Sequence, residues 1–95
     1  MADTPAIIQV VDGFQLGTPA EPLAKISTTR RDDGSIVITH TFVSDTLKGQ
    51  GIGGRLVQAV AEQARKEGVK IIPLCSYANK VMTKDDSFSD VLAPL

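Results

Sequence analysis

The stretch LKGQGIGGRL, from Leu47 to Leu56, carries four glycines within six residues. It follows a β-branched run and opens a helical pattern, so we expect the glycines at the start of a helix. The first N–H groups of a helix have no intrahelical partner, and the helix dipole adds positive potential there. Glycine has no Cβ and lets a ligand approach the main chain closely. The stretch therefore predicts an anion site, most naturally for phosphate, in preference to a flexible glycine-rich loop.

Downstream of the glycines, apolar residues recur every three or four positions, while charged and amide side chains fall on the other side. Gly68 is the expected end of this helix, because glycine readily adopts the left-handed conformation that closes helices. A short strand, Val69 to Cys75, should follow, and Pro73 indicates that this strand lies at an edge of the sheet or has one side unpaired. The apolar stripe consists of Ile52, Leu56, Val57, Val60, Ala61 and Ala64.

Upstream, the run from Ser35 to Val43 is the clearest strand of the chain. Both of its faces would be largely apolar or β-branched, which predicts a central strand covered on both sides. With the helix and the strand 69–75 it should form a βαβ unit with parallel strands. Regular alternation would put Ile36, Ile38, His40 and Phe42 on one face and Val37, Thr39, Thr41 and Val43 on the other.

The flanking segments predict smaller elements. Asp12-Gly13 lies between two apolar runs, Ala6 to Val11 and Phe14 to Leu16, which indicates a β-hairpin. A strand is expected at Leu23 to Thr29 and two short helical pieces in the tail 77–95, the second starting near Asp85 to Ser87. We therefore expect one mixed α/β (α+β) domain over residues 1–95, with antiparallel strands, a βαβ unit and short C-terminal helices.

Composition excludes several classes of protein. Ten basic and eleven acidic residues give a formal net charge of −1, which does not favour a nucleic-acid partner. No apolar stretch approaches the roughly 20 residues of a membrane span, and the first residues do not resemble a signal peptide. The single cysteine, Cys75, has no partner for an internal disulfide. These features indicate a cytoplasmic protein, and we expect no metal site.

Two familiar phosphate-binding patterns fit poorly. Gly49, Gly51 and Gly54 match G-x-G-x-x-G, but that dinucleotide motif should follow its strand directly. It also requires an acidic residue at the end of the next strand, where Cys75 stands. A Walker loop requires Lys and Ser or Thr after its last glycine, whereas Arg55 follows here.

The segment from Lys48 to Gly53 resembles the Q/R-x-x-G-x-G/A motif of the GNAT acetyltransferases, with Lys48 in place of the usual Gln or Arg. Three segments in order look like the small GNAT-like N-acetyltransferases of about a hundred residues, and the resemblance covers roughly residues 6 to 92. They are His40-Thr41-x-Val43, Leu47-x-Gly49-Gln50-Gly51-Ile52-Gly53 and Pro73-x-Cys75-Ser76-Tyr77.

This resemblance implies acetyl-CoA as cofactor, with its pyrophosphate on the glycine loop and its pantetheine arm between two splayed parallel strands. Pro73 would contribute to the splay, because it lacks one N–H that would help to join the strands. The cofactor-binding residues implied by the resemblance are Val43, Lys48, Gly49, Gln50, Gly51, Ile52, Gly53, Gly54 and Asn79.

The same resemblance makes His40 and Cys75 the candidate catalytic residues. His40 could act as a general base, directly or through a water, although a lone histidine is often structural. Cys75 could accept the acetyl group or protonate the leaving thiolate, or it could simply be a small buried apolar residue. Tyr77 is a further candidate acid, and the main-chain N–H of Val43 a candidate oxyanion donor.

The sequence does not identify the molecule that accepts the acetyl group. GNAT enzymes usually build the acceptor site from additional N-terminal helices and C-terminal strands, which this chain is not expected to have. The site would then be open, or a protein partner would complete it. We expect an acetyl-CoA-dependent N-acetyltransferase that acts on an amine of a small molecule or protein. The alternatives are a non-catalytic acyl-CoA binder or sensor and a plain interaction module.

Overall fold

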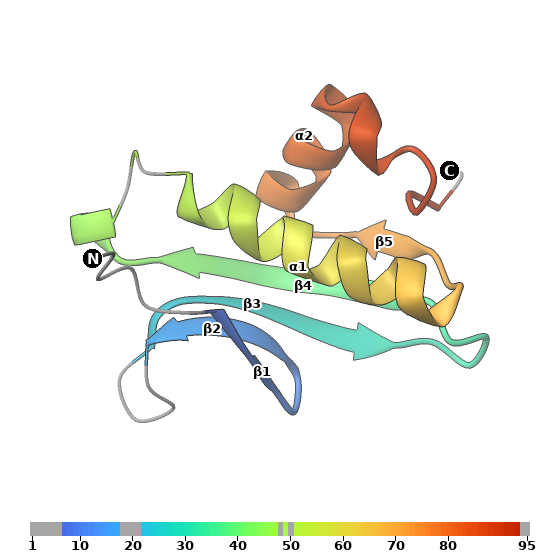
Figure 1. Ribbon diagram of the computed structural model, residues 1–95, viewed down its shortest axis with the longest axis horizontal. Coiled ribbons are helices and arrows are strands. Elements are labelled where there is room, and N and C mark those ends of the chain that lie inside the picture. Colours follow the sequence, from blue (N-terminus) through green and yellow to red (C-terminus); the bar gives the residue numbers. More distant parts are fainter. Residues whose placement is uncertain (1–6, 18–21, 48, 50, 94–95) are drawn as a thin grey trace.

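The computed structural model describes residues 7–17, 22–47, 49 and 51–93 (Figure 1). Five strands form one sheet in the order β1-β2-β3-β4-β5, in which the first four are antiparallel and β4 and β5 are parallel. This confirms the mixed α/β fold. The elements are β1 (Ile7–Val10), β2 (Gly13–Gly17), β3 (Pro22–Arg30), β4 (Ile36–Val43), η1 (Asp45–Leu47), α1 (Ile52–Glu67), β5 (Ile71–Pro73), α2 (Ser76–Lys84) and η2 (Asp86–Phe88).

Helix α1 packs across β2, β3 and β4 through its apolar stripe, whose six residues are all buried. Burying such a stripe against a sheet is what stabilises a helix of this kind. The helix ends as predicted at Gly68, which has φ 72° and donates its N–H to Ala64 and Arg65 carbonyls. The strand–helix–strand path from β4 through α1 to β5 is therefore the predicted βαβ unit.

Both helices lie on the same side of the sheet (Figure 1). Ala78 and Met82 of α2 belong to the same buried cluster as the stripe of α1 and the inward residues of β4 and β5. On the other side of β4 no helix packs within the described residues, so the second covering layer that the sequence predicted is not found among them, although Val37 on that side is buried. We call this second side the open face. It leaves Leu23 and Phe42 exposed.

A β-bulge at Thr39 changes which residues of β4 share a face. Ser27 pairs with His40, but the next residue of β3, Thr28, pairs with Ile38, so Thr39 is an additional residue in β4. One inserted residue reverses the alternation of side chains beyond it. Ile36 and Ile38 face the helices. Beyond the bulge, however, Thr41 and Val43 take that side, and His40 and Phe42 turn to the open face.

Strand β5 is shorter than the predicted 69–75. After Pro73 the N–H groups of Leu74 and Cys75 both donate to the carbonyl oxygen of Ile38, at 3.0 and 3.1 Å, and the chain then enters α2. β5 is the last strand of the sheet, as Pro73 predicted. The tail adds one parallel bridge to its outer edge, with Ile71 N–H donating to Val91 and Ala93 N–H donating to Ile71.

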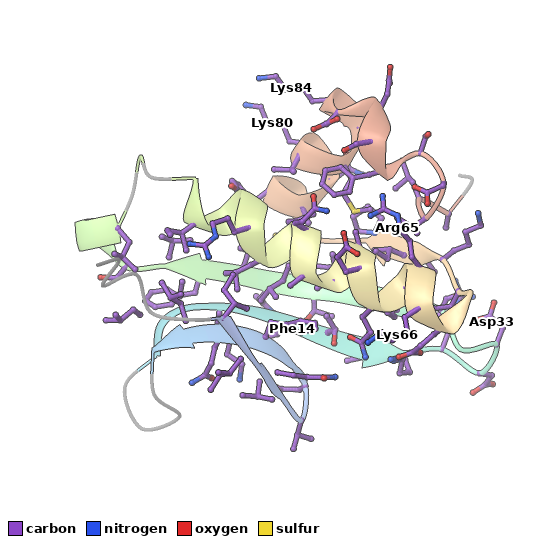
Figure 2. All side chains as sticks on the ribbon, viewed as in Figure 1. Phe14, Asp33, Arg65, Lys66, Lys80 and Lys84 are labelled. Atoms are coloured by element: carbon purple, nitrogen blue, oxygen red, sulfur yellow. The ribbon has the colours of Figure 1, made fainter. Side chains whose placement is uncertain are left out.

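Two arginines hold α1 to its surroundings. Arg30 of β3 forms a fork with Glu67, at 2.7 and 3.0 Å, near the C-terminus of α1. Arg65 extends from α1 toward the C-terminal tail (Figure 2), where it forms a second fork with Asp90, at 2.8 and 3.0 Å, and donates to the Ser87 carbonyl.

Neither helix within the described ranges is long and apolar enough to cross a membrane.

Candidate functional site

A cavity of about 740 Å³ lies where β4 ends, between η1, the first turn of α1 and the start of α2. Its lining residues come from segments up to 36 positions apart in the sequence, the separation of Thr41 and Tyr77. These segments meet at the carboxyl end of a central strand. Sites for small ligands are commonly found in such places. The lining residues are Thr41, Phe42, Val43, Ser44, Asp45, Leu47, Gly49, Gly51, Ile52, Gly53 and Tyr77.

The N-terminus of α1 forms one wall. Gly51 is the N-cap, with φ 73° and ψ 16°, a left-handed conformation that glycine adopts without strain, and it provides no side-chain cap. The first helical hydrogen bond runs from Arg55 N–H to Gly51 O at 3.1 Å. The N–H groups of Ile52 and Gly53 therefore have no acceptor within the helix, and both residues line the cavity.

Tyr77 forms the facing wall and depends on Gly53. A Cβ built on Gly53 would lie 2.6 Å from Tyr77 Cζ, far below a normal contact. By contrast, a Cβ on the neighbouring Gly54 would meet no atom within 4 Å. The absence of a side chain at position 53 thus lets the phenol ring cross the first turn of α1.

The floor of the cavity is a gap between β4 and β5. Their pairing ends at Ile38 and Pro73, so the last five residues of β4 have no partner in β5. Ser44 N–H donates to Leu23 O at 2.8 Å, and main-chain groups alternate sides along an antiparallel strand. Thr41 and Val43 therefore direct their N–H and C=O groups toward the gap.

Pro73 does not cause this gap, contrary to the sequence-based expectation. Ile36 N–H bonds to Lys70 O, and Leu74 N–H bonds to Ile38 O, so the even-numbered residues of this segment face β4. Ile71 exchanges hydrogen bonds with the tail on the outer side. The nitrogen of Pro73 consequently faces outward too. The gap arises because Leu74 and Cys75 share a single acceptor as the chain turns away.

Cys75 lies beside the gap as the N-cap of α2, and its Sγ is 3.5 Å from Thr41 Oγ1. Partial burial of the thiol acts to raise its pKa. Hydrogen bonds from the Thr41 hydroxyl and from the N–H groups of Ala78, Tyr77 and Thr41 outweigh that effect, so the pKa of Cys75 is lowered. A thiolate at a helix N-terminus is a good nucleophile.

The two predicted catalytic residues lie on different sides of the sheet. His40 is exposed on the open face, whereas Cys75 contacts Thr41 on the helix side. Of the predicted cofactor residues, Val43, Gly49, Gly51, Ile52 and Gly53 line the cavity, whereas Gly54 and Asn79 do not. Lys48 and Gln50 lie outside the described residues.

Several lining residues were not among the sequence-based candidates, namely Thr41, Phe42, Ser44, Asp45 and Leu47. Thr41 and Leu47 belonged to segments quoted for the resemblance, but regular alternation placed Thr41 on the face opposite Ile36 and Ile38. Only the position of Asp45 between the strand and the glycines signalled a role.

Comparisons with known proteins show which family and fold the chain resembles. The family model described as GCN5-related N-acetyl-transferase matches residues 13–91. The chain is 40% identical to a GCN5-like protein from Staphylococcus aureus, named as a candidate N-acetyltransferase, with a TM-score of 0.83 over 99% of this chain and 93% of that one. It also resembles the ribosomal-protein-S18-alanine N-acetyltransferase of Escherichia coli, over 88% of this chain and 53% of that one. At 17% identity and a TM-score of 0.59, that likeness shows the fold alone. No curated protein matches the sequence.

Proposed function

Because the chain belongs to the GCN5-related N-acetyltransferase family, we propose that it transfers the acetyl group of acetyl-CoA to an amine. One observation carries the proposal: the cavity joins the uncapped N-terminus of α1 to the gap between β4 and β5. The first feature suits a pyrophosphate and the second suits an extended arm that carries amides.

The residues present fit acetyl-CoA. Main-chain N–H groups at Gly51, Ile52 and Gly53 would bind the pyrophosphate, each charge-assisted hydrogen bond contributing about 1.5–3 kcal/mol. Main-chain groups of Thr41 and Val43 would pair with the pantetheine amides in the gap. The thioester supplies an activated acetyl group with a thiolate as leaving group.

At the thioester, the Val43 N–H would donate to the oxyanion that develops on the carbonyl oxygen. Cys75 could act either as an acid or as a nucleophile. As a thiol it would protonate the departing thiolate of CoA. As a thiolate it would attack the acetyl carbon, displace CoA and hold the acetyl group as a thioester until the amine takes it.

His40 would act from the open face. An acceptor that reaches the gap from that side meets the imidazole first, and His40 would take the proton that the amine loses when its nitrogen bonds to the acetyl carbon. Cofactor and acceptor would thus approach β4 from opposite sides.

The second candidate is a non-catalytic acyl-CoA binder. It is favoured by the open face itself, since no helix of the described residues builds a wall for an acceptor there. This alternative predicts saturable CoA binding without turnover.

Calorimetric titration with CoA, with ATP as a control for phosphate binding alone, tests the site. Micromolar binding of CoA and much weaker binding of ATP are expected. Intact mass after exposure to acetyl-CoA, for the natural chain and for Cys75→Ala, shows whether Cys75 becomes acetylated. Release of CoA in the presence of amines then separates an enzyme from a binder. Failure to bind CoA at millimolar concentration would exclude both functions.

A further inference from the structure

The open face beside the gap carries two large exposed apolar side chains. Phe42 is 53% exposed, and Leu74, the residue after β5, is 69% exposed. Ile71 and Pro73 are buried on the helix side, and the same alternation continued one residue beyond β5 assigns the exposed Leu74 to the open face. The two side chains therefore flank the gap from its two strands, on the side opposite Cys75.

His40 stands next to this pair. It lies two residues before Phe42 on the same face of β4, about 7 Å along the strand. Phe42 also lines the cavity on the helix side of β4. The apolar pair, the imidazole and the gap are thus continuous with the proposed cofactor site.

The charge of this face indicates which amines it suits. Among the described strand residues that face this side, none is a carboxylate, and the one cation is Lys25, which pairs with Asp12 at 3.2 Å. The cavity beyond the end of β4 contains a single described carboxylate, that of Asp45, which is too few for the several charges of a polyamine. A polyamine or a lysine-rich peptide brings additional positive charges that need acidic partners. An amine with a single charge and an apolar substituent needs only a base and an apolar contact.

We propose that the acceptor is a primary monoamine with an aromatic or branched aliphatic group two or three bonds from its nitrogen. This inference rests on the proposed acetyltransferase function. The apolar group packs between Phe42 and Leu74 and places the nitrogen beside His40. The nitrogen, which enters as the neutral amine, attacks the acetyl carbon, the carbon–sulfur bond breaks, and His40 takes the proton from nitrogen. The thiol of Cys75 gives its proton to the departing CoA thiolate, and both residues then exchange protons with solvent. The products are an N-substituted acetamide and CoA.

The test compares acceptors in a CoA-release assay with acetyl-CoA: 2-phenylethylamine, 3-methylbutylamine, spermidine and a lysine-containing peptide. We expect the first two to have kcat/KM at least about tenfold above the others, the discrimination that a small apolar contact provides. Higher kcat/KM for spermidine or the peptide would overturn the inference while leaving the acetyltransferase function intact.

Two variants locate the contact. Phe42→Ala and Leu74→Ala should each raise the KM for 2-phenylethylamine about tenfold, and Leu74→Ala, which lies outside the cavity lining, should leave the KM for acetyl-CoA unchanged. Val11→Ala is the matched control, because Val11 is a fully exposed apolar residue in the β1–β2 turn, away from the gap; it should change neither constant. Unchanged KM in both test variants would reject the apolar contact.

NMR tests whether the amine binds at the open face independently of any measurement of activity. With CoA bound, 2-phenylethylamine should shift the NMR amide signals around Phe42 and Leu74, and spermidine should not. If CoA binds but no amine is acetylated, the proposed catalytic function fails and the acceptor inference fails with it. Absence of CoA binding would instead mark the failure of the cofactor site itself.

Discussion

At the scale of single residues, two adjacent glycines at the start of α1 have different reasons to be glycine. Gly53 is buried beneath the ring of Tyr77, whereas Gly54 faces open space. The pattern of glycines in the sequence does not separate them, because the separation depends on a side chain 24 positions away. Of these two glycines, only Gly53 therefore controls the shape of the cavity.

Gly53→Ala should displace the Tyr77 ring and weaken CoA binding about tenfold or more, with little loss of helix stability because alanine favours helices. Gly54→Ala is the matched control and should bind CoA as the natural chain does, with equal or greater thermal stability. Calorimetry and thermal denaturation measure the two effects. Equal CoA affinity in both variants would show that the Tyr77 wall is not needed.

The thiol of Cys75 should ionise more readily than that of a free cysteine. Because its pKa is lowered, the pH at half-maximal alkylation by iodoacetamide should lie below the value of about 8.5 for free cysteine. Thr41→Val, which removes the hydroxyl hydrogen bond, should move that midpoint upward, and Thr41→Ser should restore it. Alkylation followed by mass spectrometry gives the profile; a midpoint at or above that of free cysteine would contradict the account.

At the scale of elements, the sequence predicted what local chemistry determines. Asp12-Gly13 correctly marked the hairpin, and the stripe from Ile52 to Ala64 correctly marked α1 and its buried side. The bulge at Thr39 left no such signal, because apolar and β-branched residues occupy both faces of β4. Alternation therefore could not predict on which side of the sheet His40, Thr41 and Phe42 lie.

The sequence also could not predict that β5 ends at Pro73. Nothing in the sequence shows that Leu74 and Cys75 share the Ile38 carbonyl, since that depends on where the chain must turn to place α2 against α1. Pro73 suggested a cause for the gap, but its orientation in the sheet could only come from the register of β4 and β5.

That orientation gives a direct prediction. Pro73→Val should leave CoA affinity within about twofold of the natural value, since the added N–H points outward rather than into the gap. If the proline instead kept the strands apart, the variant would close the gap and bind CoA much more weakly. Calorimetric titration of the variant, after circular dichroism has established that it is folded, decides between these outcomes.

At the scale of the whole molecule, the two arginine forks connect parts that are far apart in the sequence. Arg30 links β3 to the end of α1, and Arg65 links α1 to the tail that borders β5. Hydrogen bonds from these arginines lower the pKa values of Glu67 and Asp90 in the folded chain. Stability should therefore depend on pH.

A carboxylate with a lowered pKa stabilises the fold above its unfolded pKa, about 4.3 for Glu and 3.9 for Asp, and this contribution is lost as pH falls through the lower folded value. The melting temperature should accordingly drop as pH decreases from about 5 to 3. Arg65→Met should melt a few degrees lower at pH 7 and show a weaker dependence on pH, as followed by circular dichroism. A pH dependence as steep as that of the natural chain would show that the Asp90 fork does not contribute.

The outer border of β5 has a consequence for how copies of the chain behave together. Unpaired strand edges recruit strands from other molecules, and proteins block them with proline, short strands or covering segments. Here residues 91–93 bond to Ile71, Pro73 offers no outward donor, and the opposite edge, β1, is only four residues long. Both borders are thus poor templates for intermolecular sheet growth, and the chain should stay monodisperse at the high concentrations that weak-ligand titrations require.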